Sequence, residues 1–327
     1  MADFITLNDY AARFGTQGEV AYKTIIEMQS KTNAVLQVLP FHPCNSGFID
    51  KAVIRTSLPE VAWRLINKGV PYSKSASKQV SFTCGTMEAL AQIDEELVDI
   101  NGNSAEWRLS ENAAFQEAMN QEWATTFFYG DEKVTPAKFT GLSAYYYAKG
   151  QDSIYSDRII DCGGTGNNLT SLWITCMGPQ TMYGIFPDKT KAGFSYEDKG
   201  KQKITDNNGN SFYAYESQYK WRSGLVLKDP RYVVRLANID MTKLTTSDAD
   251  TFIDKLITGY NRIENPMMGK MSIFCNRDLE TYLWIMSKKS TNVRLSLDDF
   301  GGRKVTHFVG APILRCDAIL NTESAIS

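Results

Sequence analysis

At 327 residues the chain exceeds the size at which a single hydrophobic core stops growing, about 250 to 300 residues, so the sequence predicts two subdomains. Hydrophobic residues make up 43% and charged residues 22%, which is ordinary globular usage and excludes a disordered or fibrous class. The 35 basic and 37 acidic residues nearly cancel, which excludes a general electrostatic attraction to nucleic acid.

The cysteines and the start of the chain indicate a compartment. None of the six cysteines forms a C-x-x-C pair, which argues against a zinc ribbon or a secreted disulfide scaffold and favours buried, reduced thiols. The first residues form neither a basic nor an apolar leader, and no run of about 18 apolar residues follows them. We therefore expect a soluble protein without membrane contact, made in a cytoplasm.

The first hundred residues are predicted to form an arm followed by a long β excursion. Residues 1–45 are the arm, with a helix near Gln17 to Ser30 and an extended run from Val35 to Phe41. The segment Asn67 to Lys78 is polar and is predicted to project into solvent or onto a neighbouring molecule. Around it, turn-prone residues separate four predicted strands: Phe48–Arg55, Val61–Ile66, Gln79–Thr83 and Leu90–Val98.

A long amphipathic helix is predicted to begin near Ser110, where Glu111 in the first turn suits the helix dipole. Roughly 18 residues would form a rod of about 27 Å, long enough to brace a sheet, and Gly130 ends it. Its apolar side chains recur at three- and four-residue spacing: Phe115, Ala118, Met119, Trp123 and Phe127.

Strands and glycine-rich turns are predicted from Ser153 to Asp240, and an αβ pattern follows. A hairpin near 198–216 is indicated by Asn208-Gly209, because both positions tolerate positive φ. Asn276 is predicted to cap a helix that follows a strand. The other predicted elements are strands Leu172–Met177, Thr181–Phe186, Arg231–Ile239 and Met271–Cys275, a helix from Ser247 to Asn265, and β structure from Lys304 to Leu320.

No segment of the sequence closely matches a catalytic, nucleotide-binding or metal-binding motif. The glycine-rich loop from Asp161 to Asn168 lacks the lysine of a Walker loop and the spacing of a dinucleotide fingerprint. Cys162 would need a histidine to act as a nucleophile, and the sequence holds only His42 and His307. The run Asp206-x-Asn208-x-Asn210 imitates a calcium loop, although no helices flank it and a hairpin is favoured. The sequence thus predicts no catalytic residue, cofactor or metal.

Acidic residues cluster at Asp94, Glu95, Glu96 and Asp99. Adjacent carboxylates on a strand point to opposite faces, so Glu95 and Glu96 would not converge on one substrate. We expect a solvated surface or a salt bridge between subunits.

Three segments together resemble the tailed-phage major capsid protein family, which has the Hong Kong 97-like or Johnson fold. Ala114 to Tyr129 is similar to the spine helix of that family, and Gly130 to Leu142, with Pro136, Phe139 and Gly141, is similar to its exit loop. Ser272 to Leu283 resembles its strand followed by an Asn-capped helix. Phe308 to Ile313, with Asp317, resembles its C-terminal Gly-x-Pro strand. The likeness is greatest to coat proteins of short-tailed phages of the Bordetella phage and epsilon-fifteen type.

The resemblance implies an α+β fold in which the parts follow a fixed order. They are an N-terminal arm at 1–45, an E-loop excursion and the start of the peripheral domain at 46–103, a spine helix and exit loop of the peripheral domain at 104–150, an axial domain at 151–300 with a hairpin insertion near 198–216, and a C-terminal strand segment at 301–327. The implied spine and exit-loop residues are Phe115, Met119, Trp123, Phe127, Gly130, Pro136 and Gly141.

The implied function is that of a major capsid protein, not an enzyme, and without a cofactor. Copies would assemble into pentamers and hexamers of an icosahedral shell around double-stranded phage DNA, held by weak non-specific contact. Further partners would be separate scaffolding and portal proteins and a cement or decoration protein. Assembly would take place in the host cytoplasm and the product would be the virion. The expected subunit-interface residues are Lys68, Tyr72, Lys74, Lys78, Asn208 and Gly209.

Two rival interpretations stay open at the level of sequence. An encapsulin-like cellular compartment shares the fold and would package an enzyme cargo rather than DNA. A cytosolic αβ enzyme would use Cys162 or the nearby glycine loop.

Overall fold

The computed structural model describes residues 33–100, 105–150, 153–190, 193–205, 209–246, 249–287, 295–300 and 303–327. The described residues form two compact α+β units. The first contains residues 86–123 and 193–222, and the second contains residues 33–85, 124–190 and 223–327 with the gaps given above. The predicted helix near Gln17 to Ser30 lies outside the described residues.

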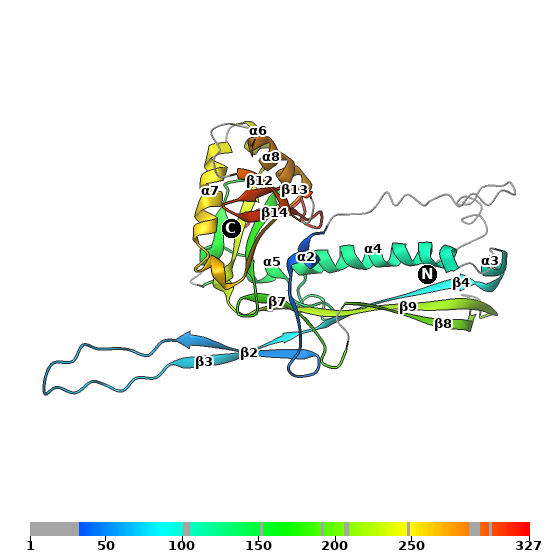
Figure 1. Cartoon of the computed structure of the whole chain (residues 1–327), viewed down its shortest axis with the longest axis horizontal. Helices are drawn as coiled ribbons and strands as arrows, with labels where there is room; N and C mark the ends of the chain where they lie inside the picture. Colours follow the sequence, from blue (N-terminus) through cyan, green and yellow to red (C-terminus); the bar gives the residue numbers. More distant parts are fainter. Residues whose placement is uncertain are drawn as a thin grey trace. The chain divides into compact units, whose positions relative to one another are not determined.

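In the first unit, helix α4 lies alongside a small antiparallel sheet (Figure 1). Its central strand is β9, which pairs with β8 from Ser211↔Thr205 to Trp221↔Phe194 and has β4 on its other side. Aromatic rings join the helix to the sheet, since Phe115 stacks on Tyr219 with centroids 4.8 Å apart. The elements are β4 (Gly85–Asp94), α3 (Glu95–Ile100), α4 (Ala105–Tyr129), β8 (Phe194–Thr205) and β9 (Ser211–Leu227), with α4 and β9 continuing into the second unit.

Three sequence predictions in this unit need correction. Helix α4 begins at Ala105 rather than near Ser110, and its 25 residues span about 37 Å. The predicted strand Leu90–Val98 ends at Asp94, because the Asp94 carboxylate accepts a hydrogen bond from the Glu96 N–H (2.9 Å) and starts helix α3. The hairpin predicted near 198–216 is longer, since β8 and β9 pair from Phe194↔Trp221 to Thr205↔Ser211.

The core of the second unit is a seven-stranded mixed sheet in the order β12-β13-β14-β11-β6-β10-β5. Its strands are β5 (Ile159–Asp161), β6 (Thr170–Met177), β10 (Val233–Ile239), β11 (Lys270–Cys275), β12 (Leu295–Phe300), β13 (Arg303–Phe308) and β14 (Ala311–Arg315). The associated helices are α6 (Met241–Thr246), α7 (Ala249–Asn261) and α8 (Arg277–Ser287), with short helical turns η1 (Ser156–Arg158), η2 (Pro230–Tyr232) and η3 (Pro266–Met268). Figure 1 shows α7 and α8 on one side of this sheet.

Strand β6 is buried along its whole length because both faces of the sheet are covered. Leu172, Ile174 and Cys176 belong to the hydrophobic cluster shared with the helices. Trp173 points the other way and lies 6.1 Å, between ring centroids, from Phe128 at the end of α4. Because side chains alternate along a strand, one face of β6 packs on the helices, and the other face places Trp173 near Phe128.

Three element boundaries in the last third of the chain can be compared with the sequence predictions. Asn276 caps α8, as predicted, because its side-chain oxygen accepts from the Leu279 N–H (2.9 Å). The predicted β run from Lys304 to Leu320 is instead two strands, which end at Arg315. The helix predicted to run to Asn265 ends at Asn261, and Asn265 is the N-cap of η3. Ser247, its predicted start, lies outside the described residues.

The remaining strands of the second unit lie in the chain before β5 or between β6 and β10. Strand β7 (Met182–Phe186) pairs in parallel with β1 (Phe41–Pro43) and antiparallel with the last residues of β9. Residues predicted to run extended from Val35 instead form one turn of helix, α2 (Val35–Val38), and α5 (Leu142–Tyr145) is equally short. Strands β2 (Ile49–Ser57) and β3 (Ala76–Thr83) pair with each other as a two-stranded ribbon.

Candidate interaction surface and its supports

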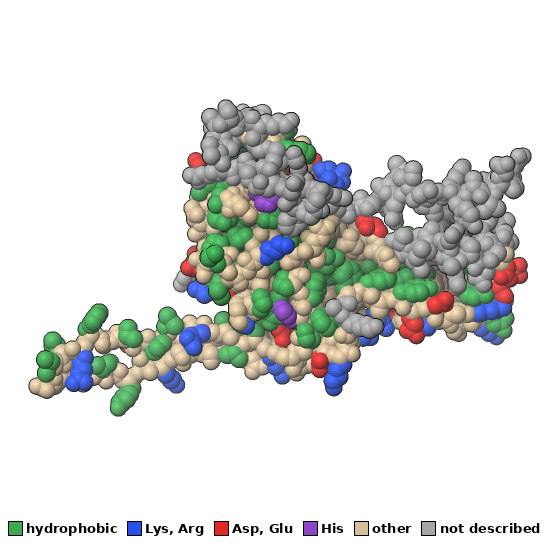
Figure 2. Space-filling view, in the orientation of Figure 1, with side chains coloured by type: hydrophobic (Ala, Val, Ile, Leu, Met, Phe, Trp, Pro, Cys, Tyr) green, Lys and Arg blue, Asp and Glu red, His purple; other side chains and the backbone are tan. Residues whose placement is uncertain are grey.

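The loop at the end of the β2–β3 ribbon is the most exposed part of the described chain. Residues 58–75 form no strand, so the predicted strand Val61–Ile66 is wrong; among the described residues its alternating apolar pattern has no partner strand. Trp63 and Tyr72 are fully exposed. The large apolar side chains exposed here are Leu58, Val61, Trp63, Leu65, Ile66, Val70 and Tyr72 (Figure 2).

Such a concentration of exposed apolar side chains indicates a surface that another chain covers. Of the expected interface residues, Lys68, Tyr72, Lys74 and Lys78 are all exposed in this ribbon and loop. Gly209 is exposed at the β8–β9 turn with φ +86°, and Asn208 lies outside the described residues. Sequence reasoning chose the lysines and Tyr72 and missed the other apolar side chains of the loop; the period-two spacing of Val61, Trp63 and Leu65 was the available signal.

The root of the ribbon is fastened by a buried carboxylate. Asp50 in β2 accepts a hydrogen bond from the Tyr183 hydroxyl (2.7 Å) and another from the Asn45 N–H (3.3 Å). Burial, together with the Asp50 carboxylate, raises the pKa of Tyr183, so the phenol stays a donor at neutral pH. The root is therefore held to β7 while the loop reaches outward.

The buried face of α4 agrees with the predicted stripe at most positions. Met119, Trp123 and Phe127 are buried and Phe115 is half-buried, whereas Ala118 is exposed. Trp123 stacks on Trp221 with centroids 5.8 Å apart and planes at 8°. Phe128, outside the predicted stripe, is also fully buried, because the end of the helix is covered by Trp173 and Phe274.

The segment after α4 closes on itself through two glycines. The Gly130 N–H donates to the Thr126 carbonyl, and the Gly141 N–H donates to the Gly130 carbonyl, both at 2.8 Å. A Cβ at Gly130 would lie 2.5 Å from the Phe139 carbonyl oxygen, and one at Gly141 would lie 2.8 Å from that of Phe127. Both positions therefore require glycine, whereas Pro136 lies exposed in the turn between them.

We expect Gly141→Ala to destabilise the fold by about 1–3 kcal/mol, because the new methyl group must displace backbone atoms. Urea unfolding followed by tryptophan fluorescence measures the change. Gly69→Ala is the matched control, since a Cβ at Gly69 meets no atom within 4 Å. Equal unfolding free energies for the two variants would contradict the close approach of the chain at Gly141.

A buried ion pair joins five segments of the second unit. The Arg235 guanidinium in β10 donates to Glu323 Oε2 (3.0 Å) and to the Tyr146 carbonyl (2.8 Å), and both charged side chains are at most 7% exposed. Glu323 also accepts from the hydroxyls of Tyr129 and Ser171, both at 2.5 Å. Burial and the neighbouring carboxylate raise the pKa of Tyr129. The network ties the end of α4 and residue 323 to the sheet.

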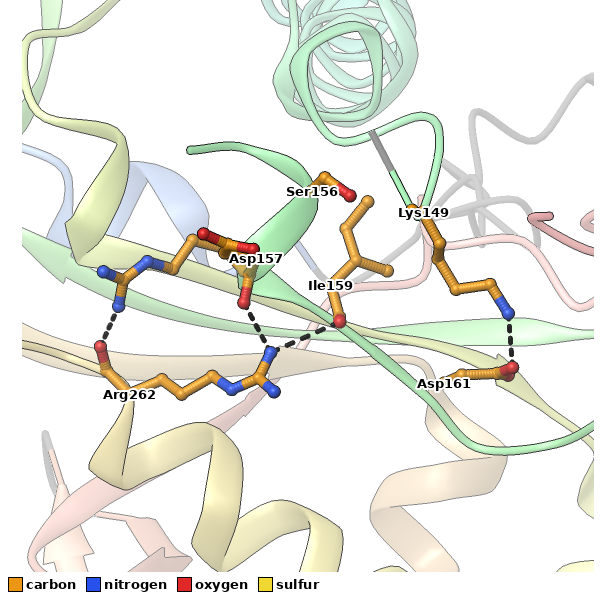
Figure 3. Close-up of a pocket in the computed structure, with 8 residues that line it drawn as sticks. Lys149, Ser156, Asp157, Ile159, Asp161 and Arg262 are labelled. Atoms are coloured by element: carbon orange, nitrogen blue, oxygen red, sulfur yellow. Dashed lines mark hydrogen bonds and ion pairs between the residues drawn. The ribbon is translucent and has the colours of Figure 1, made fainter. Parts of the chain in front are cut away.

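A cavity of about 730 Å³ lies beside β5 (Figure 3). Its charged side chains are engaged with one another and with the backbone. Lys149 pairs with Asp161, Arg158 donates to the Arg262 carbonyl, and Arg262 donates to the Asp157 carbonyl (2.5 Å). Burial tends to raise the pKa of Asp161, but hydrogen bonds from Lys149, Gly163 and Asn238 lower it overall. The cavity is thus lined by structural contacts rather than by a reactive pair.

The glycine loop and Cys162 have the environment of a structural turn. The loop leads into strand β6 rather than into a helix N-terminus, so it lacks the context of a phosphate-binding loop. Burial raises the pKa of the Cys162 thiol to about 12, which keeps it protonated and a poor nucleophile. The charged residues that line its pocket are Asp240, Lys243 and Lys255. Asp206 and Asn208 of the calcium-like run lie outside the described residues.

No helix within the described ranges is both long and apolar enough to cross a membrane. Likewise, the described residues hold no group of three or more potential metal ligands from His, Cys, Asp and Glu. The acidic residue Glu95, expected on a strand, instead starts α3 and forms an ion pair with Lys201 of β8.

A sequence model of the family of major capsid protein GP7 matches residues 16–327. The chain belongs to this major capsid protein family. The capsid protein is also similar to the solved structure of bacteriophage epsilon15, with 30% identity, a TM-score of 0.77, and coverage of 99% of this chain and 98% of the other. No curated protein sequence matches it.

More distant likenesses include the bacteriophage JBD30 capsid, with 11% identity, a TM-score of 0.48 and coverage of 96% of this chain and 99% of that one. The SrpI encapsulin of Synechococcus elongatus is similar at 10% identity and a TM-score of 0.46, covering 72% of this chain and 96% of the encapsulin. The family and the epsilon15 likeness confirm the Hong Kong 97-like α+β fold and the resemblance to epsilon-fifteen-type coat proteins. This capsid protein is a structural coat protein of an icosahedral phage shell, and its place is the virion.

Proposed function

We propose that the capsid protein assembles into pentamers and hexamers whose shell encloses double-stranded phage DNA, and that the loop at 58–75 grips the neighbouring copy. One observation supports this most strongly: the loop exposes seven large apolar side chains on a ribbon that no other described part of the chain covers. A second copy is the partner that a shell supplies at every position, since head-to-tail contacts close into rings.

The proposed parts follow from this assignment. The β2–β3 ribbon serves as the E-loop, α4 as the spine helix and residues 130–141 as the exit loop. The seven-stranded sheet with α7 and α8 serves as the axial domain, and residues 301–327 complete it. The β8–β9 hairpin near 198–216 goes with the spine helix in the peripheral domain, because its residues form one unit with 86–123. Residues 1–45, of which the structure describes 33–45, are proposed as the N-terminal arm.

Burial of the loop's apolar side chains against a neighbouring copy would stabilise the subunit contact appreciably. Burying one large apolar side chain stabilises a contact by about 1.5–3 kcal/mol, and association loses part of that gain in translational and side-chain freedom. Interfaces that hold permanent assemblies typically bury about 2,000 Å² or more. The loop therefore contributes a strong local contact to a larger interface.

The test is a substitution that spares the fold. Trp63→Ser should leave the unfolding free energy of the unassembled chain within about 0.5 kcal/mol, because the indole is fully exposed there. Shell formation, counted by electron microscopy and sedimentation, should fall sharply. Trp63→Phe is the matched control and should retain assembly. Shells of Trp63→Ser at the yield of the unaltered protein would exclude the loop as a subunit contact.

The remaining proposals concern partners and place. Assembly in the host cytoplasm would use a separate scaffolding protein and a portal, with a cement or decoration protein on the finished shell. The balance of 35 basic and 37 acidic residues supports only weak, non-specific contact with the packaged DNA. Expression of the chain alone and together with a scaffolding protein, followed by electron microscopy, would show whether closed shells need the second protein.

A further inference from the structure

Two cysteines far apart in the sequence meet at the root of the β2–β3 ribbon. The Cys44 and Cys84 Sγ atoms lie 3.3 Å apart, and both residues are free thiols. Cys44 directly follows β1, and Cys84 lies between β3 and β4. The whole ribbon and its loop therefore lie in the chain between the two sulfur atoms.

The backbone holds both thiols in place. The Cys44 N–H donates to the Phe186 carbonyl of β7 (2.8 Å), and the Cys84 N–H donates to the Phe48 carbonyl (3.0 Å). On the other side, a Cβ added to Gly224 would lie only 3.2 Å from the Cys84 Cα, so the chain is closely packed there. A disulfide has sulfur atoms about 2.05 Å apart, so small side-chain rotations would bring these two to bonding distance.

We propose that Cys44 and Cys84 are a site of disulfide formation, a covalent clasp across the root of the ribbon. The co-reactant is a small-molecule disulfide of the glutathione class. The pair stays reduced in a reducing cytoplasm and oxidises when the particle reaches an oxidising medium. This timing rests on the proposed function, because only a released particle changes compartment.

The reaction balances in two exchange steps. Cys84 is partly exposed and Cys44 is 4% exposed, so the Cys84 thiolate is the one that attacks glutathione disulfide, forming a mixed disulfide and releasing one glutathione thiolate. The Cys44 thiolate then attacks the Cys84 sulfur, forming the clasp and releasing the second. Two thiols are oxidised, one glutathione disulfide is reduced, and the two protons pass to the released glutathiones.

The surroundings make this exchange slow. Burial raises the pKa of both thiols, and the nearby Asp50 carboxylate raises them further, so little thiolate exists at neutral pH. Slow exchange suits a clasp that must not close while the ribbon is still finding its neighbour. Once formed, the disulfide would link the end of β1 to the end of β3 even if the loop between them were cut.

The test uses the exposed loop as a cleavage point. Trypsin cuts the intact chain in the loop, after Arg64 or Lys68, and Cys44 is the only cysteine of the sequence on the N-terminal side of that cut. Protein purified with reductant, then incubated with glutathione disulfide and alkylated, is nicked and run on denaturing gels. We expect the two fragments to stay joined without reductant and to separate when reductant is added.

The controls identify the partner sulfur. The joined band should be lost in Cys44→Ser and in Cys84→Ser, and it should persist in Cys162→Ser. Mass spectrometry of the unaltered protein should find the Cys44 and Cys84 peptides linked, about 2 Da lighter than their summed reduced masses, which holds even if a serine variant misfolds. Fragments of the oxidised protein that separate without reductant, or that stay joined in Cys84→Ser, overturn the proposal.

Assembly is scored separately on the same samples by electron microscopy. A clasp that forms in a chain that makes no shells even when a scaffolding protein is expressed with it would refute the proposed function and leave the clasp standing. Shells that form while the fragments separate would refute the clasp alone.

Discussion

Replacing Trp123 by alanine should lower the free energy of unfolding by about 3–5 kcal/mol. The indole is 2% exposed on α4 and stacks nearly parallel on Trp221, so the change removes a large buried surface and a ring contact together. Proteins of this kind are stable by only about 5–15 kcal/mol, so the loss is a large part of the total. Shell formation should fail with it.

The measurement is chemical denaturation of the unassembled variant, followed by circular dichroism, with particle counts by electron microscopy. Tyr72→Ala is the matched control for stability alone, because this aromatic side chain is fully exposed and its loss should change stability by less than about 0.5 kcal/mol, although it lies in the loop proposed to contact a neighbour. Normal shells and normal stability for Trp123→Ala would mean that the helix does not pack on the sheet through this residue.

Glu323→Ala should be comparably damaging, at about 3–5 kcal/mol. The substitution leaves the Arg235 guanidinium, which is only 5% exposed, without its carboxylate partner. It also removes the acceptor for the Tyr129 and Ser171 hydroxyls. An uncompensated buried charge destabilises a fold far more than the loss of an exposed ion pair.

Two comparisons make the result specific. Glu197→Ala breaks a surface pair with Lys199, whose side chain is one-third exposed, and should change stability by only about 0–1 kcal/mol. The double variant Arg235→Met with Glu323→Leu removes both charges and should recover much of the loss. Thermal unfolding monitors all three. Equal effects of Glu323→Ala and Glu197→Ala would show that the buried pair carries no special weight.

The sequence predicts this fold well where the signal is local. Spacing along α4 identified Met119, Trp123 and Phe127 as buried, and the side chain of Asn276 caps α8 as its position suggested. The predicted start of α4 was wrong because a segment inside the helix has the residues typical of a helix start. Ser110 with Glu111 has the composition of a helix start, although α4 already begins at Ala105.

The candidate site was harder to predict because its parts are related only through the fold. Arg235 and Glu323 are 88 residues apart, and Cys44 and Cys84 are 40 apart, with no motif linking either pair. Val61 to Ile66 has the alternation of a strand, but a strand needs a partner, and the described residues of the chain provide none there. Such a pattern is informative about the assembled shell rather than about the single subunit.

The β2–β3 ribbon makes the newly synthesised subunit prone to aggregation. In the described part of the chain β2 and β3 form a strand ladder only with each other. Ser46 and the Asn45 side chain bond to the backbone of Ile49 and Lys51 at the root, so the edges that an extended peptide could join lie farther along the ribbon. Lys51, Arg55 and Lys78 lie exposed along the ribbon, where positive charge discourages indiscriminate strand addition. Until neighbours cover the ribbon, aggregation is avoided best when the concentration of unassembled chain is low and each subunit is rapidly incorporated into a growing shell.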